Sequence, residues 1–243
     1  IHIKYNTGLN RIGFLPTETN WIIKSLNNSS LTIKSVYSHL AISEEKKPNK
    51  TSEKQINLFK SIITKYSNKK NNKPFFHLLN SSGIFNYPEL ELDAVRPGIS
   101  LYGYANNFYW DKDLLPISSL TTKIFQIHNV KKGDSVGYNN GWFAKRNSKI
   151  GVIPIGHADG IPRSFGMQKG WFTIKNQKAY IVGNVCMDII MIDITEINCK
   201  VGDEAILFDN KISAASIAEN CKTISYELLS NISNRVPRNF IEN

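Results

Sequence analysis

The sequence lacks a cysteine framework and any apolar run of membrane-spanning length. Its 243 residues include only three cysteines, Cys186, Cys199 and Cys221, which cannot all pair within one chain and whose spacing fits no zinc site. We therefore expect a reducing, cytoplasmic compartment and no bound metal. No apolar run reaches the roughly 18 residues that cross a bilayer, and no signal peptide is visible, so we expect no membrane partner.

The chain also has little acidic charge relative to basic charge. Thirty Lys and Arg against twenty Asp and Glu give a formal net charge of +10, which can indicate nucleic acid or an acidic ligand. The Lys and Asn residues cluster in segments 44–54 and 65–73, without an arginine-rich run or interleaved aromatic residues. We therefore favour a solvated surface over a nucleic-acid interface.

The first half of the chain has the rhythm of parallel βα units. The patterns predict strands over residues 1–5, 31–39, 75–79 and 92–95, and helices over 16–26 and 51–66. Each predicted strand ends at or just before a polar residue, namely Asn6, His39, Asn80 or Arg96. Four strands are too few for a closed eight-stranded barrel, so we expect the missing strands to precede Ile1, which is not an initiator Met.

The stretch 93–103 is where we expect ligand chemistry. Arg96 follows an apolar run, Pro97 and Gly98 turn the backbone, and residues 99–102 resume the apolar pattern. Exposed backbone N–H groups in such a turn suit phosphate, and a guanidinium can donate to a ring nitrogen or a carboxylate. The alternative is a structural arginine that caps a strand beside an ordinary turn.

The second half changes character after a predicted linker over residues 106–116. Short strands are predicted over 119–130, 149–154, 170–175, 179–185, 188–194 and 204–208, with helices over 213–220 and 225–232 and a last strand over 235–241. Gly133-Asp134 and Gly202-Asp203 mark turns between strands. We therefore expect an α/β domain over 1–116 and a mainly antiparallel β domain over 117–243.

Several ordered motifs make the chain resemble the bacterial alanine racemases. They are His2-Ile3-Lys4-Tyr5-Asn6-Thr7-Gly8, Ser38-His39-Leu40-Ala41, the run 77–83, Val95-Arg96-Pro97-Gly98, Val136-Gly137-Tyr138, Gly156-His157-Ala158-Asp159, Cys186-Met187-Asp188, Tyr226-Glu227-Leu228-Leu229 and Arg235-Val236-Pro237-Arg238. The resemblance covers nearly the whole chain. It implies a partial pyridoxal 5'-phosphate (PLP)-binding (β/α)8 barrel followed by the β domain.

The resemblance implies roles for the cofactor contacts. Arg96 matches the arginine that hydrogen-bonds the PLP ring nitrogen, and His39 matches a histidine beside the ring. The phosphate contacts are matched by Ser81, by the backbone of Gly98 and Ile99, and by Tyr226. Outside the resemblance, each of these residues passes as ordinary turn, helix-start or strand-end chemistry.

The resemblance also implies roles in proton transfer and substrate binding. Tyr138 matches a catalytic base that the partner subunit donates, and Arg11 matches a contact to the substrate carboxylate. Lys4 matches a lysine that is carbamylated in many members and helps to position that arginine. Met187 and Asp188 match partner-subunit residues near the substrate carboxylate. Without the family, Tyr138 passes as a half-buried strand tyrosine, and the others as strand-end or turn residues.

Two departures from the family pattern stand out. His157 stands where the family commonly has a tyrosine that lines the substrate entryway, so access or specificity can differ. The N-terminal motif that carries the PLP lysine is not found in this sequence, so we expect a C-terminal portion that is inactive in isolation.

The sequence is therefore interpreted as the C-terminal part of an alanine racemase, an isomerase. We expect L-/D-alanine interconversion for peptidoglycan synthesis, PLP as cofactor, and a homodimer that shares its active sites. The alternatives are a broader-specificity racemase that also takes serine, and a noncatalytic fragment that contributes a dimer interface.

Overall fold

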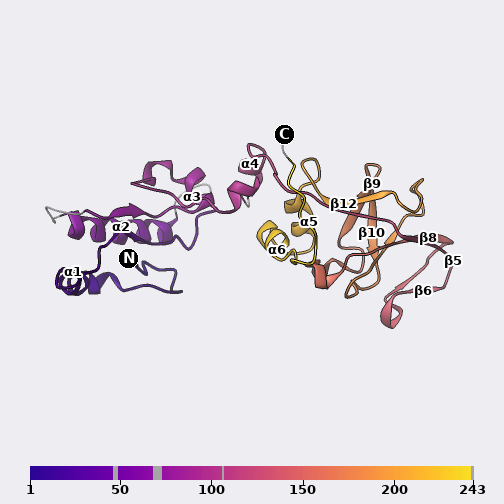
Figure 1. Cartoon of the computed structure of the whole chain (residues 1–243), viewed down its shortest axis with the longest axis horizontal. Helices are drawn as coiled ribbons and strands as arrows, with labels where there is room; N and C mark the ends of the chain where they lie inside the picture. Colours follow the sequence, from indigo (N-terminus) through magenta and orange to yellow (C-terminus); the bar gives the residue numbers. More distant parts are fainter. Residues whose placement is uncertain (46–48, 68–72, 106, 242–243) are drawn as a thin grey trace. The chain divides into compact units, whose positions relative to one another are not determined.

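The computed structural model describes residues 1–45, 49–67, 73–105 and 107–241, and it divides into two compact units, Ile1–Leu114 and Leu115–Asn243. Figure 1 draws the first unit in indigo to magenta and the second in rose to yellow. The Lys/Asn-rich positions 68–72 and position 106 of the predicted linker lie outside the described residues.

Unit 1 is built on a small parallel sheet. Its strands β1 (His2–Lys4), β2 (Ser35–Tyr37) and β3 (Phe75–His77) pair in parallel in that order. Its helices are α1 (Thr19–Asn27), α2 (Lys50–Ser67), α3 (Ser81–Asn86) and α4 (Phe108–Asp111), with 3-10 turns η1 (Pro16–Glu18), η2 (Pro88–Leu90) and η3 (Ile99–Tyr102). The helices predicted over 16–26 and 51–66 are therefore present, the first with a 3-10 turn at Pro16.

The two faces of this sheet differ because side chains alternate along a strand. Ile3, Val36 and Phe76 are register partners on one face and are buried in a core that also takes Phe59 and Tyr66 of α2. Each such fully buried apolar side chain stabilises the fold by about 1.5–3 kcal/mol. The opposite face carries mostly polar residues, and the candidate site lies there.

The strand predicted over 92–95 was wrong. Residues 93–96 do run beside β3, since Asp93 N donates to Phe76 O at 3.1 Å and Arg96 N donates to Leu79 O at 3.0 Å. The Asp93 carboxylate, rather than a backbone carbonyl, accepts from Phe76 N at 2.9 Å. Leu92 has a positive φ of 54°, which is not a strand conformation. A single parallel bridge between Asn80 and Arg96 remains.

Unit 2 consists of an antiparallel sheet, a small hairpin and two short helices. Its seven-stranded sheet has the order β4-β12-β9-β10-β11-β8-β5, in which every pairing is antiparallel. The strands are β4 (Leu120–Lys123), β5 (Gln126–Val130), β8 (Ser148–Ile153), β9 (Trp171–Ile174), β10 (Gln177–Val182), β11 (Ile190–Asp193) and β12 (Glu204–Phe208). A β6 (Ser135–Val136) and β7 (Trp142–Phe143) hairpin, the 3-10 turns η4 (Tyr138–Asn140), η5 (His157–Asp159) and η6 (Arg163–Phe165), and helices α5 (Ala214–Asn220) and α6 (Ser225–Ser230) complete it.

These two units confirm the α/β plus β fold class. The predicted strand over 119–130 is two strands, and the predicted linker contains the short helix α4. The strand predicted over 235–241 was wrong, because this segment folds back on itself. Val236 N donates to Ser233 O at 3.1 Å, and the Arg238 guanidinium donates to the carbonyls of Ile232, Ser233 and Val236.

Within the described ranges, no helix is long and apolar enough to cross a membrane. Those residues also contain no group of three or more His, Cys, Asp or Glu side chains that could hold a metal ion.

Candidate active site

The carboxyl ends of β1, β2 and β3 bring the first group of predicted site residues together. Lys4 ends β1, His39 follows β2, and Ser81 follows β3 at the first position of α3. Because parallel strands end at one edge of their sheet, these residues share that edge. Arg96 joins them through the bridge that its backbone makes with Asn80.

The Arg96 guanidinium is the centre of this edge. Nη1 donates to His77 Nδ1 at 2.5 Å, and Nη2 faces Ser38 O at 2.8 Å, Leu78 O at 3.0 Å and His39 Nδ1 at 3.2 Å. A guanidinium has five N–H donors in a fixed plane. In the described part of the chain the Nε–H and one of the two Nη1–H groups have no acceptor, so donors of fixed direction remain for a ligand.

Two stacked aromatic rings pack beside the Arg96 guanidinium. The rings of Tyr37 and His77 stack with centroids 4.9 Å apart and planes 9° from parallel, and the Arg96 guanidinium carbon lies 5.2 Å from the Tyr37 ring centroid. Sequence reasoning gave neither Tyr37 nor His77 a role. The alternation of β2 and β3 could have found both, because it places them beside one another on the polar face.

The side chains at this edge of the sheet create a positive electrostatic environment. Burial, with the positive charges of Arg96, Arg11 and Lys4, lowers the pKa of His39 to about 4. Burial and the charges of Arg96 and His2 lower the pKa of His77 to about 4. Both rings are therefore neutral near pH 7 and can accept hydrogen bonds from Arg96. Burial and the nearby arginines 11 and 96 also lower the pKa of the Lys4 amine. Such a cluster suits an anionic ligand.

Arg11 is exposed, in the loop that returns to β1. The return is fixed by two backbone hydrogen bonds, from Asn6 N to Phe14 O at 2.8 Å and from Phe14 N to Lys4 O at 2.9 Å. Gly13 has a φ of 126°, and a Cβ there would lie 2.8 Å from Asn6 N, so this tight return requires glycine.

The Ser81 hydroxyl accepts hydrogen bonds from the turn at residues 98–100. Its buried hydroxyl oxygen accepts from Gly98 N at 2.8 Å, from Ser100 N at 3.3 Å and from Ser100 Oγ at 3.2 Å. The Ile99 N–H has no acceptor among the described residues, although the Ile99 carbonyl accepts from Tyr104 N. A turn with several inward N–H groups and a serine hydroxyl can hold phosphate oxygens.

The second group of predicted site residues lies in unit 2, in turns, in one loop and on helix α6. Tyr138, in η4, is 71% exposed, and its carbonyl accepts from Asn184 Nδ2 at 3.2 Å. Met187 is 60% exposed, and Asp188 beside it is exposed. His157 N donates to Cys186 O at 2.9 Å, so the His157 turn lies against the loop that carries Met187 and Asp188. Tyr226 lies on α6.

The Arg235 motif supports the His157 turn. Arg235 Nε and Nη2 both donate to Asp159 Oδ1 at 2.9 Å, and Gly156 N donates to Asp159 Oδ2 at 2.8 Å. The Asp159 side chain is buried and the Arg235 side chain is exposed, so removing Arg235 would leave a buried carboxylate with two hydrogen-bond donors fewer. Sequence reasoning gave this motif no role.

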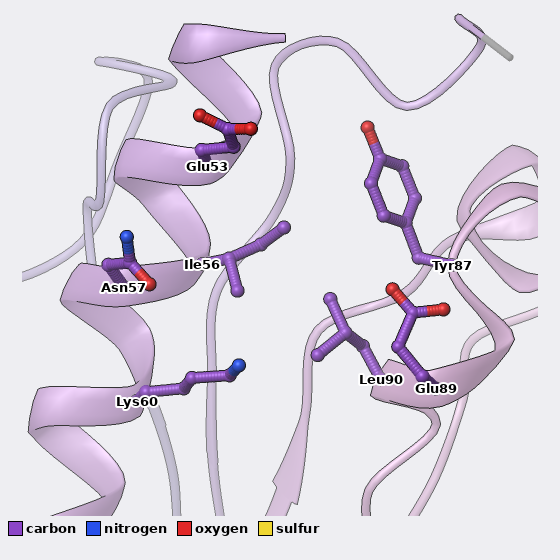
Figure 2. Close-up of a pocket in the computed structure, with 7 residues that line it drawn as sticks. All are labelled: Glu53, Ile56, Asn57, Lys60, Tyr87, Glu89 and Leu90. Carbon is purple, nitrogen blue, oxygen red and sulfur yellow. The ribbon is translucent and has the colours of Figure 1, made fainter. Parts of the chain in front are cut away.

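A separate cleft of about 250 Å³ opens on unit 1 between α2 and the segment 87–90. Figure 2 shows Glu53, Asn57 and Lys60 on α2 across from Tyr87 and Glu89. Among the described residues that line it, none belongs to the predicted site. The cleft therefore contributes nothing to the chemistry of the Arg96 edge.

Comparison with known proteins gives the same family for both units. Residues 1–106 match the family model for the alanine racemase N-terminal domain, and residues 117–240 match that for the alanine racemase C-terminal domain. The alanine racemase of Halothermothrix orenii is 38% identical over 248 residues, with 99% of this chain and 65% of the relative covered.

Solved structures agree in fold. The alanine racemase of Streptomyces lavendulae superposes with a TM-score of 0.92 at 25% identity, covering 100% of this chain and 66% of that one. The Bacillus anthracis alanine racemase with bound L-Ala-P superposes with a TM-score of 0.86 at 32% identity, covering 100% and 64%. The chain thus spans about 65% of the length of the curated relatives it matches.

Proposed function

The chain belongs to the alanine racemase family, and on that premise we propose that it interconverts L- and D-alanine with PLP, as part of a protein that supplies D-alanine for peptidoglycan. The observation that carries the proposal is the Arg96 guanidinium, held by four acceptors at the carboxyl edge of a parallel sheet with its Nε–H free among the described residues. We take residues 1–116 as part of the PLP-binding barrel and residues 117–243 as the β domain.

The donor set fits PLP at both ends. Arg96 would donate to the ring nitrogen, and His39 would lie beside the ring. The turn of Ser81, Gly98 and Ile99 would hold the phosphate, with Tyr226 as a further contact. When bound, PLP delocalises the electrons left behind when the α-carbon of alanine loses its proton. Because a guanidinium stays protonated at any working pH, Arg96 would keep the ring nitrogen of bound PLP unprotonated.

The remaining residues act on the substrate. Tyr138 would remove or return the α-proton on one face as a general base and acid. Arg11 would bind the substrate carboxylate, and Met187 and Asp188 would approach it from the partner of a homodimer that shares its sites. The lowered pKa of Lys4 supports its carbamylation, because only an uncharged amine attacks carbon dioxide. We place the protein in the cytoplasm.

Arg96→Glu in the intact protein tests the proposal. The carboxylate would let the ring nitrogen take up a proton, so racemisation should slow by on the order of 10²-fold or more, and pyruvate should become easier to detect. Arg96→Lys is the matched control, since it keeps the charge without the fixed fork.

A PLP-loaded Arg96→Glu protein that racemises alanine at the wild-type rate would contradict the proposed role. Serine competition in the same assay separates an alanine racemase from a broader-specificity enzyme. His157 is exposed beside the loop of Met187, where a change of side chain can alter which substrate enters. Complete absence of racemisation by the intact wild-type protein would favour the noncatalytic alternative.

A further inference from the structure

The polar face of the unit 1 sheet carries a row of side chains that leads away from Arg96. His2 on β1, Ser35 on β2 and His77 on β3 lie on the face opposite the apolar core residues Ile3 and Val36. His2 Nδ1 lies 2.7 Å from Ser35 Oγ, Ser35 Oγ lies 3.0 Å from His77 Nε2, and His77 Nδ1 lies 2.5 Å from Arg96 Nη1. Three strands thus contribute one continuous set of contacts.

The chemistry of the groups fixes the direction of the two contacts that His77 makes. A guanidinium has no acceptor, so Arg96 must donate and His77 Nδ1 must accept. A neutral His77 ring then carries its proton on Nε2 and donates to Ser35 Oγ. The Ser35 oxygen has a second lone pair and a hydroxyl proton, so it can either donate to His2 Nδ1 or accept from it, and His2 holds the hydroxyl in both cases. The low pKa of His77 agrees with this neutral form.

Two constraints together leave His77 one orientation. The stack on Tyr37, with planes 9° apart, fixes the plane of the ring. Within that plane, the bond to the buried Ser35 hydroxyl fixes its rotation, because turning the ring would leave the partly buried His77 N–H and the Ser35 oxygen without each other as partners. Nδ1 is therefore aimed at Arg96 Nη1.

We propose that Ser35 and His2 are positioning residues that fix the tautomer and rotation of His77, and through it the direction in which Arg96 presents its free N–H. The inference rests on the proposed function for the role of Arg96, whereas the relay itself consists only of residues of this chain. At metal sites, losing a residue that orients a ligand typically lowers affinity or activity by roughly 10- to 100-fold, and we expect the lower end of that range here.

Ser35→Ala in the intact, PLP-loaded protein is the test, with two readouts. In ¹⁵N-histidine spectra, wild-type His77 should carry its proton on Nε2, protected from solvent exchange. Ser35→Ala should speed that exchange and shift the His77 ring nitrogens. It should also lower kcat for alanine roughly 10-fold with little change in KM, because Arg96 would point differently while Arg11 stays in place.

Matched variants separate positioning from stability. Ser52→Ala removes another buried serine hydroxyl of unit 1, which donates to Ile42 O at 2.7 Å, and should leave the His77 signals unchanged. His2→Asn places an acceptor near the Nδ1 position and should behave as wild type, whereas His2→Leu should resemble Ser35→Ala.

The proposal is overturned if His77 exchange and nitrogen shifts in Ser35→Ala match wild type, or if Ser52→Ala alters them equally. Failure of the proposed function has a different signature. An intact wild-type protein that does not racemise alanine would overturn that function, and the His77 spectra would still decide the relay.

Discussion

Acidification should loosen the Arg96 cluster only well below the pH at which histidine ordinarily takes up a proton. His39 and His77 both accept hydrogen bonds from Arg96, and burial and nearby positive charge lower the pKa of each from about 6.5 to about 4. Between these pH values the two histidines take up protons in the unfolded chain but stay largely neutral in the folded chain. The free energy of unfolding should therefore fall as the pH falls from about 6.5 towards 4, with no contribution from these rings above pH 7.

The magnitude follows from the size of the shift. At about 1.4 kcal/mol for each pKa unit, the full shift corresponds to about 3 kcal/mol for each ring at pH 4. Both rings are partly exposed, so solvent screening reduces the contribution to about 1 kcal/mol each. We therefore expect the pair to remove about 2 kcal/mol from the free energy of unfolding between pH 7 and pH 4.

Histidine NMR titration of the intact protein measures both pKa values directly, and urea unfolding at several pH values measures the energy. Arg96→Met removes the second cause of each shift, so both pKa values should rise part of the way to 6.5, with burial still lowering them. Arg96→Lys keeps the charge and should leave them low. Wild-type rings that titrate near 6.5, or an Arg96→Met variant with unchanged pKa values, would refute the reasoning.

Two further outcomes are expected in the intact protein. Tyr138→Phe should lower racemisation on the order of 10²-fold or more while PLP stays bound. Tyr180→Phe, which changes another exposed tyrosine of unit 2, should leave the rate unchanged. Near-normal rates of Tyr138→Phe in both directions would refute the assigned base. Gly160→Ala should lower the thermal unfolding midpoint far more than Gly133→Ala. Both glycines have a positive φ, but only at Gly160 would a Cβ lie 2.2 Å from Asn231 O. Equal losses in the two variants would contradict the packing argument.

Much of the fold could be predicted because its elements have strong local periodicity. Helix α2 buries Ile56, Phe59 and Ile62 on one face, and that spacing is visible in the sequence. The failures occurred where a side chain replaces a backbone partner. The Asp93 carboxylate takes the place of a strand carbonyl, and Arg238 binds its own neighbouring carbonyls. The local sequence pattern does not indicate where a side chain will replace a backbone hydrogen-bond partner.

The candidate site was predictable to the extent that motifs carry it. Arg96 and His39 were marked by the polar ends of predicted strands. The family resemblance added Ser81 and the cofactor roles, and these roles stay predictions. His77 and Tyr37 were missed because a strand histidine and a strand tyrosine have ordinary structural uses, and only the register of β2 and β3 shows them stacked beside the guanidinium. Register depends on pairing between distant segments, which single-strand patterns do not encode.

The hydrogen bonds on the polar face of the sheet support the proposed position of the ligand. Polar groups withdrawn from water are costly unless each finds a hydrogen-bond partner. Here His77 and two backbone carbonyls accept hydrogen bonds from the Arg96 guanidinium, and His77 also hydrogen-bonds to Ser35. Among the described residues, the Arg96 Nε–H and the Ile99 N–H are donors near this edge that the chain itself leaves unpaired. A ligand with an aromatic acceptor nitrogen and an anionic group would complete both, and PLP has these two features.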